Sequence, residues 1–276
     1  MKIAATVEEI RSAVKAWKKE GLSVGFVPTM GYLHEGHQSL MQKAVSENDR
    51  VVVSIFVNPM QFGPSEDLES YPRDLEKDAS LCEASGVDLI FHPEPKEMYH
   101  SDFSSFVDMH GLTESLCGKS RPAHFRGVCT VVTKLFNIVQ PGCAYFGQKD
   151  AQQLAVIQQM VRDLNLDVTV IGCPIIREAD GLAKSSRNSY LSADERKAAL
   201  VLSQALEVAK QLLANGEQNA AKIRNAISET IQAEPLAKVD YVELVDARTL
   251  QQVDSVERPV LVALAVYIGK TRLIDN

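Results

Sequence analysis

Several features that would point to a secreted, metal-knuckle or membrane protein are missing from this chain of 276 residues. Its five cysteines are scattered and odd in number, without a Cys-x-x-Cys pair, so neither a disulfide framework nor a zinc knuckle is expected. No stretch approaches the roughly 18 uninterrupted apolar residues of a membrane-spanning helix. The first residues are rich in glutamate and lack the apolar core of a signal peptide. We therefore expect a cytoplasmic protein without a membrane partner.

The chain also has fewer positively than negatively charged residues. The chain has 29 Lys and Arg against 36 Asp and Glu, which gives a net charge of −7. Proteins that bind nucleic acids usually carry a basic excess, so we expect no nucleic-acid partner, although a local basic pocket for phosphate is compatible with an acidic total. The 45% hydrophobic and 24% charged residues are typical of a globular protein, long enough here for one large domain or two moderate ones.

Familiar catalytic and nucleotide-binding motifs are absent as well. The sequence contains no P-loop GxxxxGK[ST], no GxGxxG fingerprint and no nucleophile elbow. It also shows no internal repeat and no low-complexity segment. Any nucleotide site must therefore use another arrangement of residues.

The first two-thirds of the chain alternate between strand and helix patterns. Residues 51–57 form a continuous apolar run rich in β-branched side chains, as expected of a strand buried on both faces. Shorter strands are predicted at 22–27 (ended by Pro28), 87–91, 144–146 and 168–171. Helices are predicted at 7–20, from about 37, and at 74–84, 128–139 and 151–164. This alternation predicts an α/β fold with a doubly wound parallel sheet.

The pattern changes after about Arg187. A capping box at residues 192–195 opens a predicted helix that runs to about Ala214, and a second helix covers 220–232. Strand patterns follow at 239–245, 259–267 and 272–274, with a hairpin turn at 269–270. We therefore expect a smaller α+β domain at the C-terminus, with the boundary between Ile176 and Asn188, and assign the domains to 1–176 and 177–276.

The first candidate segment is VPTMGYLHEGH at residues 27–37. It lies between a strand and the next helix, where ligands bind to parallel sheets and where helix N-termini attract phosphate. Gly31 and Gly36 would let the backbone approach a ligand, and His34 and His37 could donate to phosphate oxygens. The two histidines could equally cap the helix, lie on the surface or bind a metal, although HEGH lacks the HExxH spacing of zincins.

The second candidate segment is VNPMQFG at residues 57–63, directly after the strongest strand pattern. Gln61 could hydrogen-bond a small polar substrate beside the apolar Met60 and Phe62, or it could be a solvated turn residue. Its place at the carboxyl end of a buried strand favours the first interpretation.

The third candidate segment is YFGQKDAQQ at residues 145–153, again at a strand-to-helix junction. Lys149 could neutralise a phosphate, and Asp150 could accept hydrogen bonds from ribose hydroxyls. If a helix starts at Asp150, Gln153 lies near its opening. The alternative is that Asp150 only caps the helix and Lys149 is solvated.

The fourth candidate segment is READGLAKSSRN at residues 177–188. Two hydroxyls, from Ser185 and Ser186, stand between the cations Lys184 and Arg187. Such a cluster could close over a triphosphate while charge moves to the leaving pyrophosphate, or it could be a polar linker between domains.

The four segments together supply the groups that a nucleoside triphosphate needs, namely imidazole, ammonium, guanidinium and hydroxyl. An HxGH-like turn combined with a KxSxx-like loop is typical of enzymes that transfer adenylyl groups. Two other hypotheses are a nucleotidylyltransferase, which would stop after that transfer, and a non-catalytic nucleotide-binding module.

Six segments carry a resemblance to a known family. PTMGYLHEGH, SIFVNPMQFG, YPR, HFRGV, FGQKDAQQ and GLAKSSRNSYL resemble the signature segments of the pantothenate synthetase (pantoate–β-alanine ligase) family in order and spacing, from about Val24 to Leu191. The final RLIDN is also similar to family endings. The resemblance therefore covers nearly the whole chain.

The resemblance implies a fold and a reaction. The fold is a Rossmann-like sheet of the HIGH/KMSKS nucleotidyl-transfer type, related to class I aminoacyl-tRNA synthetases, with a smaller C-terminal domain as a lid, in a homodimer. ATP and pantoate would form pantoyl adenylate and pyrophosphate with the help of Mg²⁺. The amine of β-alanine would then displace AMP and give pantothenate.

The resemblance also implies roles for particular residues. His37 would be the catalytic acid, with His34 and Lys149 at the phosphates. Gln61 and Gln153 would hold pantoate, and Gln61 would also lie beside β-alanine. The metal candidate by position is Asp78, unless phosphate oxygens and water hold Mg²⁺. The implied ATP-binding residues are Met30, Gly31, Tyr32, Leu33, His34, Glu35, Gly36, His37, Gly147, Gln148, Lys149, Asp150, Ile176, Lys184, Ser185, Ser186 and Arg187.

Two positions depart from the family pattern. The family commonly has Glu where Gln148 stands and an apolar residue where Lys184 stands. The sequence does not indicate a role for the positive charge that Lys184 adds.

Overall fold

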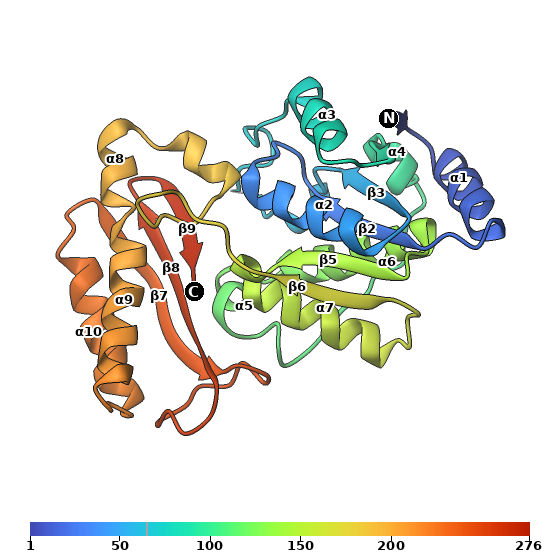
Figure 1. The fold of residues 1–276 in the computed structure, drawn as a ribbon. Coiled ribbons are helices and arrows are strands. Elements are labelled where there is room, and N and C mark those ends of the chain that lie inside the picture. The colour runs from blue at the N-terminus through green and yellow to red at the C-terminus, as the bar shows by residue number, and fades with distance from the viewer. Residues whose placement is uncertain (65) are drawn as a thin grey trace. The chain divides into compact units, whose positions relative to one another are not determined.

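The structure, a computed structural model, describes residues 1–64 and 66–276 and consists of two compact units (Figure 1). The first unit contains Met1–His110, Arg121–Gln148 and Gln153–Pro174. The second contains Gly111–Ser120, Lys149–Gln152 and Ile175–Asn276. The second unit thus includes two short segments from the middle of the chain, a grouping that the sequence does not indicate. The domain assignment at 176/177 stays a prediction.

The first unit is built on a parallel sheet of six strands within the described residues, as predicted. The strand order is β1-β4-β3-β2-β5-β6. From β2 the chain adds β3 and β4 on one side, and from β5 it adds β6 on the other side. The boundary between β2 and β5 is therefore the topological switch point. The bounds are β1 Lys2–Ala4, β2 Val24–Thr29, β3 Arg50–Ile55, β4 Leu89–Phe91, β5 Cys143–Gly147 and β6 Thr169–Cys173.

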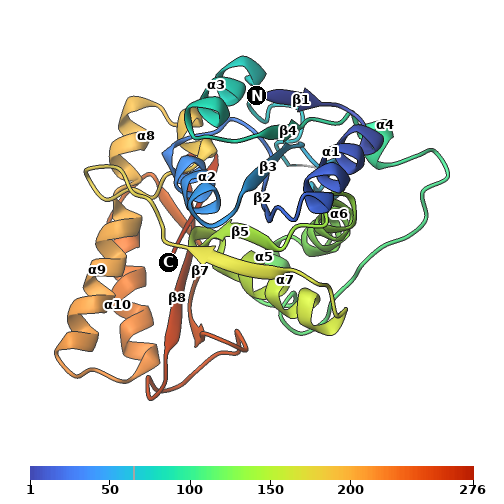
Figure 2. The ribbon, with the colours of Figure 1, turned by 45° about the vertical axis from the view of Figure 1, so that its right-hand side comes forward.

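Helices cover both faces of this sheet (Figure 2). Because side chains alternate along a strand, Val27 and Val53 pack in the cluster that contains the apolar residues of α2. Phe26 points to the other face, where its ring centroid lies 6.4 Å from that of Phe136 in α6. The helices are α1 Val7–Lys19, α2 Glu35–Glu47, α3 Leu75–Ala84, α4 Pro95–Met98, α6 His124–Val139 and α7 Ala151–Asp163.

The predicted end of the strand at 22–27 is wrong. β2 does not stop before Pro28 but continues to Thr29, with Pro28 paired in register with Ser54 of β3. On its other side β2 pairs with β5 only at Gly25 and Phe26. By Pro28 the strand has one neighbour left, so a residue without an N–H group is tolerated there.

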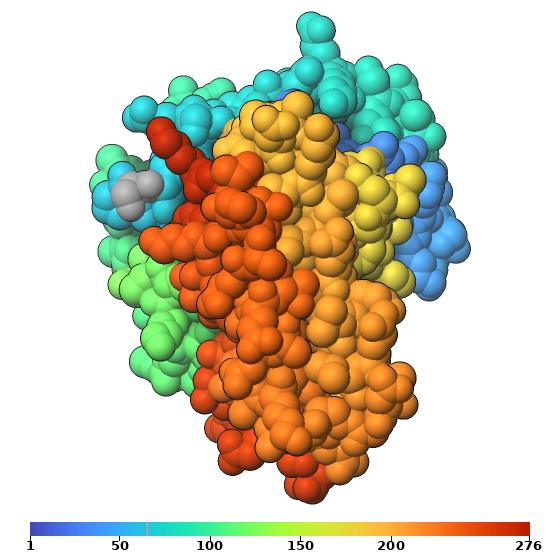
Figure 3. Space-filling model, turned by 90° about the vertical axis from the view of Figure 1, so that its left-hand side faces the viewer, coloured from blue at the N-terminus to red at the C-terminus, as the bar shows by residue number. Residues whose placement is uncertain are grey.

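The second unit is an α+β structure, as predicted. Three antiparallel strands within the described residues are β7 Ala237–Asp246, β8 Val260–Ile268 and β9 Thr271–Asp275, and Gly269 forms the expected hairpin turn with a φ of +57°. Helices α9 Val201–Ala214 and α10 Ala220–Gln232 bury Leu202 and Ile223 with the strand residues Leu244 and Leu264. Figure 3 shows the surface of these two helices in shades of orange.

The helix predicted to run from residue 193 to 214 is interrupted. The capping box between Ser192 and Glu195 is present, but it opens the short α8 Ala193–Ala198, and α9 starts at Val201. The N–H groups of Leu200 and Leu202 bond carbonyls three residues back rather than four, which tightens the turn. No Gly or Pro marks this point, so the sequence could not indicate the break.

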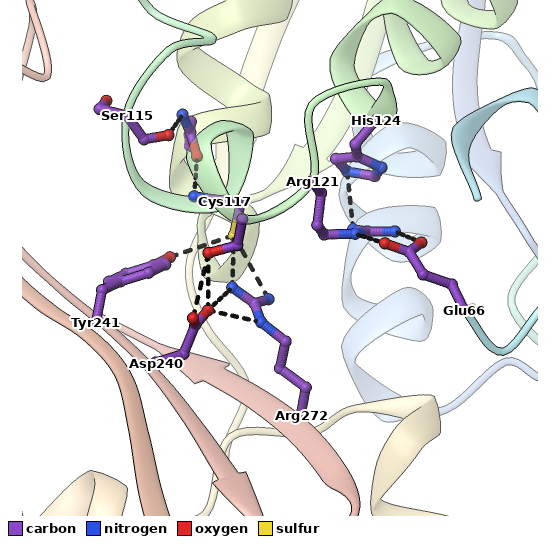
Figure 4. A network of polar contacts seen from close by, with 10 residues as sticks. Glu66, Ser115, Cys117, Arg121, His124, Asp240, Tyr241 and Arg272 are labelled. Carbon is purple, nitrogen blue, oxygen red and sulfur yellow. Dashed lines mark hydrogen bonds and ion pairs between the residues drawn. The ribbon is translucent and has the colours of Figure 1, made fainter. Parts of the chain in front are cut away.

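Polar contacts fasten the two mid-chain segments into the second unit (Figure 4). The short helix α5 Leu116–Ser120 places the Cys117 sulfur 3.2 Å from the hydroxyl of Tyr241 and 3.7 Å from the guanidinium of Arg272. Gln152 accepts a hydrogen bond from the backbone N–H of Cys117 at 2.9 Å. All five cysteines of the chain are free thiols in the structure. Among the described residues, no helix is long and apolar enough to cross a membrane.

Candidate active site

The turn after β2 has an unusual backbone. Gly31 and Tyr32 both have positive φ angles, +84° and +52°. A left-handed conformation costs a non-glycine residue such as Tyr32 roughly 1 kcal/mol, so other contacts must stabilise it. Asp78 of α3 provides them: its carboxylate accepts hydrogen bonds from the N–H groups of Tyr32 at 2.8 Å and Leu33 at 2.6 Å. A Cβ on Gly31 would lie 2.9 Å from the same carboxylate, so this position requires glycine.

Asp78 therefore does not fit the role of a metal ligand. Its side chain is buried, with the residue only 1% exposed, and each carboxylate oxygen is bonded to a backbone N–H. Burial raises the pKa of Asp78, and the N–H groups of Leu33 and Tyr32 offset only part of that rise. Mg²⁺ usually keeps several waters, whereas this carboxylate is buried and bonded to the backbone of the turn. In the described chain, no group of three or more His, Cys, Asp or Glu residues is arranged to hold a metal.

His34 and His37 form a capping box at the start of α2. Nδ1 of His34 accepts from the N–H of Gly36 at 3.1 Å, and Nδ1 of His37 accepts from the N–H of His34 at 3.3 Å. The two ring centroids are 4.1 Å apart. Because Nδ1 is the acceptor in both rings, the proton of each neutral imidazole is on Nε2. Helix capping, one of the alternatives that the sequence left open, is observed and uses Nδ1 of both rings. Donation to phosphate stays a prediction and would use Nε2.

Gln61 is not a solvated turn residue. It ends the 3₁₀ helix η1 Pro59–Gln61 after β3 and is 8% exposed. Its Nε2 lies 2.9 Å from the sulfur of Met30, so the structure brings the first two candidate segments together. Its Oε1 accepts a hydrogen bond from Asn58 at 3.2 Å, and Asn58 in turn accepts one from the hydroxyl of Tyr99 at 2.7 Å.

Sequence reasoning missed Asn58 and Tyr99 as parts of this arrangement. Asn58 stands within the signature segment SIFVNPMQFG and could have been singled out there. Tyr99 lies outside all the candidate segments, and its partner is 41 positions away in the chain. Nothing local in the sequence marks such a contact.

The third segment is divided between the units. Gly147 is the last residue of β5 and is paired with Cys173 of β6, and Gln153 occupies the third position of α7. Both belong to the first unit, with Gln148. In the second unit, the ammonium of Lys149 lies 3.9 Å from the carboxylate of Asp150.

The fourth segment begins as a small hairpin in the second unit. Arg177 and Ala183 form an antiparallel bridge, and the N–H of Lys184 donates to the carbonyl of Ile176 at 2.9 Å. The ammonium of Lys184 lies 2.9 Å from the carboxylate of Glu178 on the opposite arm. The cation that departs from the family pattern therefore has an anionic neighbour supplied by the same hairpin.

The serines of this segment open a short 3₁₀ helix. Ser185 caps η3 Ser186–Tyr190, and its hydroxyl accepts from the N–H of Arg187 at 3.3 Å. Ser186 is buried. The segment is thus an ordered turn after a hairpin, rather than an extended linker.

Comparison with known proteins decides the family. The chain matches the pantoate-beta-alanine ligase family over residues 2–276. It is 60% identical over 276 residues to a pantothenate synthetase of Clostridium acetobutylicum and 63% identical to one of Enterococcus faecalis. Each alignment covers 100% of this chain and 98% of the relative. The chain belongs to the pantoate–β-alanine ligase family.

Solved structures of this family have the same fold. A pantothenate synthetase of Thermus thermophilus superimposes with a TM-score of 0.95 at 46% identity, covering 100% of this chain and 98% of that one. The pantoate–β-alanine ligase of Francisella tularensis, complexed with β,γ-ATP and β-alanine, gives a TM-score of 0.81 at 36% identity, covering 100% and 96%. The Rossmann-like fold and the ligase function predicted from the sequence are confirmed. As a family member, the chain catalyses the ATP-dependent ligation of pantoate and β-alanine.

Proposed function

We propose that the chain performs this ligation in two steps through pantoyl adenylate. The carboxylate of pantoate bonds to the α-phosphorus of ATP, and pyrophosphate leaves. The amine of β-alanine then bonds to the carbonyl carbon, loses a proton, and AMP leaves. A free carboxylate is a poor electrophile, and adenylation provides the leaving group that the second step requires. The Francisella enzyme that holds β,γ-ATP and β-alanine supports these two substrates for the present chain.

The observation that carries the proposal is the orientation of the two imidazoles at the start of α2. Since capping uses Nδ1 of His34 and His37, Nε2–H is the donor of each ring, at the carboxyl edge of the sheet next to the switch point. We assign both groups to the phosphates of ATP, with His37 as the acid and Lys149 as an added cation. Bringing two anions together depends on such positioned charges and donors.

The same proposal assigns the other substrate-binding residues. Gln61 and Gln153 hold pantoate, and Gln61 also contacts β-alanine. The burial of Gln61 and the fixed position of its amide support this role. ATP contacts are assigned to residues 30–37, to 147–150, to Ile176 and to the loop 184–187.

Mg²⁺, the homodimer and the cytoplasmic location belong to the proposal as well. Because the oxygens of Asp78 are bonded to the turn, we assign Mg²⁺ to phosphate oxygens and water, where it neutralises charge when bound. The homodimer is supported by the resemblance to the family. The use of ATP supports the cytoplasmic location.

Isotope exchange tests the two-step scheme. With pantoate and Mg²⁺ but without β-alanine, labelled pyrophosphate should enter ATP, because the first step is reversible while the adenylate stays bound. No exchange is expected without pantoate, and added β-alanine should convert the mixture to AMP and pantothenate. If pantothenate forms while exchange stays absent, the adenylate route is wrong.

A further inference from the structure

The start of α6 has no part in the reaction proposed above, although its HFRGV segment contributes to the family resemblance. Figure 4 shows Arg121, just before this helix, together with Glu66 and His124. The guanidinium of Arg121 and the carboxylate of Glu66 form two parallel hydrogen bonds, Nε to Oε1 at 2.7 Å and Nη2 to Oε2 at 2.6 Å. This fork geometry is the strongest and most directional form of an ion pair.

Two of these three residues, Arg121 and His124, contact the main chain of Gln61. The carbonyl oxygen of Gln61 lies 3.3 Å from Nη2 of Arg121 and 3.0 Å from Nδ1 of His124. A carbonyl only accepts, so Nδ1 of His124 carries the hydrogen. Nε2 of His124 faces Nη1 of Arg121 at 3.1 Å, and since a guanidinium only donates, Nε2 is the acceptor. These contacts place a hydrogen on Nδ1 of His124.

The backbone of α6 at Gly127 packs closely against the backbone of Met60 and Gln61. A Cβ on Gly127 would lie 2.3 Å from the carbonyl oxygen of Met60 and 2.6 Å from Cα of Gln61. Asn58 donates both to the carbonyl of Gly127 at 3.1 Å and to the side-chain oxygen of Gln61. The first turns of α6 thus contact the backbone of Gln61 from one side, while Asn58 holds its amide.

We propose that Glu66, Arg121 and His124 form a positioning unit, here called the Gln61 anchor, which fixes the main chain of Gln61 and so aims its amide at pantoate. The anchor rests on the role proposed above for Gln61. Its members act through Gln61 as positioning residues. A carbonyl that accepts two directional hydrogen bonds, one from a forked ion pair, cannot rotate without breaking both.

The charge state of Glu66 is consistent with the anchor. Burial acts to raise the pKa of Glu66, but the hydrogen bonds and the charge of Arg121 outweigh it and leave that pKa lowered. Glu66 is therefore ionised at neutral pH and keeps the guanidinium in place.

A double-mutant cycle tests the anchor in the complete ligase reaction. The variants are Gln61→Ala, Arg121→Ala and the double variant, each assayed for kcat and for the KM of pantoate and of ATP. We expect Arg121→Ala to raise the pantoate KM about tenfold, the typical effect of losing a charged hydrogen bond, with little change in the ATP KM. When Gln61 is already alanine, Arg121→Ala should raise the pantoate KM by less than about twofold, because the effects of residues that act through one another are not additive.

Conservative variants keep the test valid if Arg121→Ala does not fold. Arg121→Lys keeps the positive charge but loses the two parallel hydrogen bonds, so its pantoate KM should rise less than that of Arg121→Ala. Glu66→Gln should raise the pantoate KM by a similar, intermediate amount. His124→Asn retains an N–H donor toward the carbonyl and should come closer to wild type than His124→Ala. The matched control is Arg126→Ala on the same helix, whose guanidinium carbon lies 4.0 Å from the ring centroid of Phe106 and whose side chain is 48% exposed. It should leave the pantoate KM unchanged.

The outcomes separate the anchor from the role of Gln61. Additive effects in the cycle, or equal rises in both KM values, would overturn the anchor while leaving Gln61 in the site. A rise in the pantoate KM for Arg126→Ala equal to that for Arg121→Ala would also overturn it, since the cause would be a general disturbance of α6. If Gln61→Ala leaves the pantoate KM unchanged, the proposed role of Gln61 fails and the anchor fails with it.

Discussion

At the scale of single residues, backbone partners determine which imidazole nitrogen carries the proton. In His34 and His37 a backbone N–H donates to Nδ1, and the proton is left on Nε2. In His124 a backbone carbonyl accepts from Nδ1, and the proton is held there instead. In the first pair Nε2 is the donor that we assign to phosphate, whereas His124 uses its Nδ1 proton to hold the carbonyl of Gln61. The proposed roles follow this difference: phosphate binding for His34 and His37, and positioning of Gln61 for His124.

Substitution of His34 or His37 by Asn should separate capping from catalysis. Asn keeps an acceptor near the place of Nδ1 but lacks the distal N–H donor. We expect each Asn variant to lose on the order of a hundredfold in the pyrophosphate exchange rate, as when one donor to a developing charge is removed. Its melting temperature should stay close to that of the wild type.

Alanine variants provide the comparison. His34→Ala should lose the same activity and, in addition, about 1 kcal/mol of stability, because the N-cap acceptor is gone. Thermal unfolding and exchange kinetics on the same samples measure both effects. Wild-type exchange in a folded Asn variant would remove that histidine from the phosphate site.

At the scale of structural elements, the loop at 184–187 has a fixed start and a partly exposed continuation. The hairpin that precedes it is held by the pair of Lys184 and Glu178 and by Arg177, whose guanidinium forms two hydrogen bonds with Asp275 at 2.7 and 2.8 Å. Gly181, with a φ of +98°, forms the tip of the hairpin. We therefore expect the largest movement on binding triphosphate in the residues after Lys184.

We expect this loop to tighten when nucleotide binds. Hydrogen-exchange protection around residues 181–188 should rise with ATP and Mg²⁺, because the triphosphate attracts the guanidinium and hydroxyl groups of the loop. Arg187→Ala should abolish most of that rise. Lys184→Met is the matched control. It should reduce the rise in protection less than Arg187→Ala does, since Glu178 already neutralises the charge of Lys184.

Two results would contradict this account of the loop. One is protection that does not change with nucleotide. The other is a Lys184→Met variant that loses as much of the nucleotide-dependent protection as Arg187→Ala does. That result would mean that Lys184 leaves Glu178 to bind phosphate.

At the scale of the whole molecule, each compact unit has its own apolar core and its own sheet. The family resemblance predicts that the complete enzyme is a homodimer. Light scattering at micromolar concentration should give twice the mass of one chain. A single-chain mass together with full ligase activity would show that the dimer is not required.

Much of the fold could be predicted because its signals are local. The capping box at Ser192–Glu195 joins residues three apart, and it is present in the structure. The apolar run at 51–57 predicted a strand buried on both faces, and β3 is one. The strand β1 was missed because three residues are too few to show a period. The extension of β2 through Pro28 was missed because it depends on where β5 stops pairing.

The sequence by itself determined the alternation of the main strands and helices, the kinds of reactive group and, through six ordered segments, the family. Only the tertiary structure decided how those groups are held. Asp78 bonds the turn at Leu33 across 45 positions of the chain, and Arg121 reaches the carbonyl of Gln61 across 60. Such contacts leave no periodic pattern in the sequence, because they form only when the folded sheet brings the ends of distant segments to one edge.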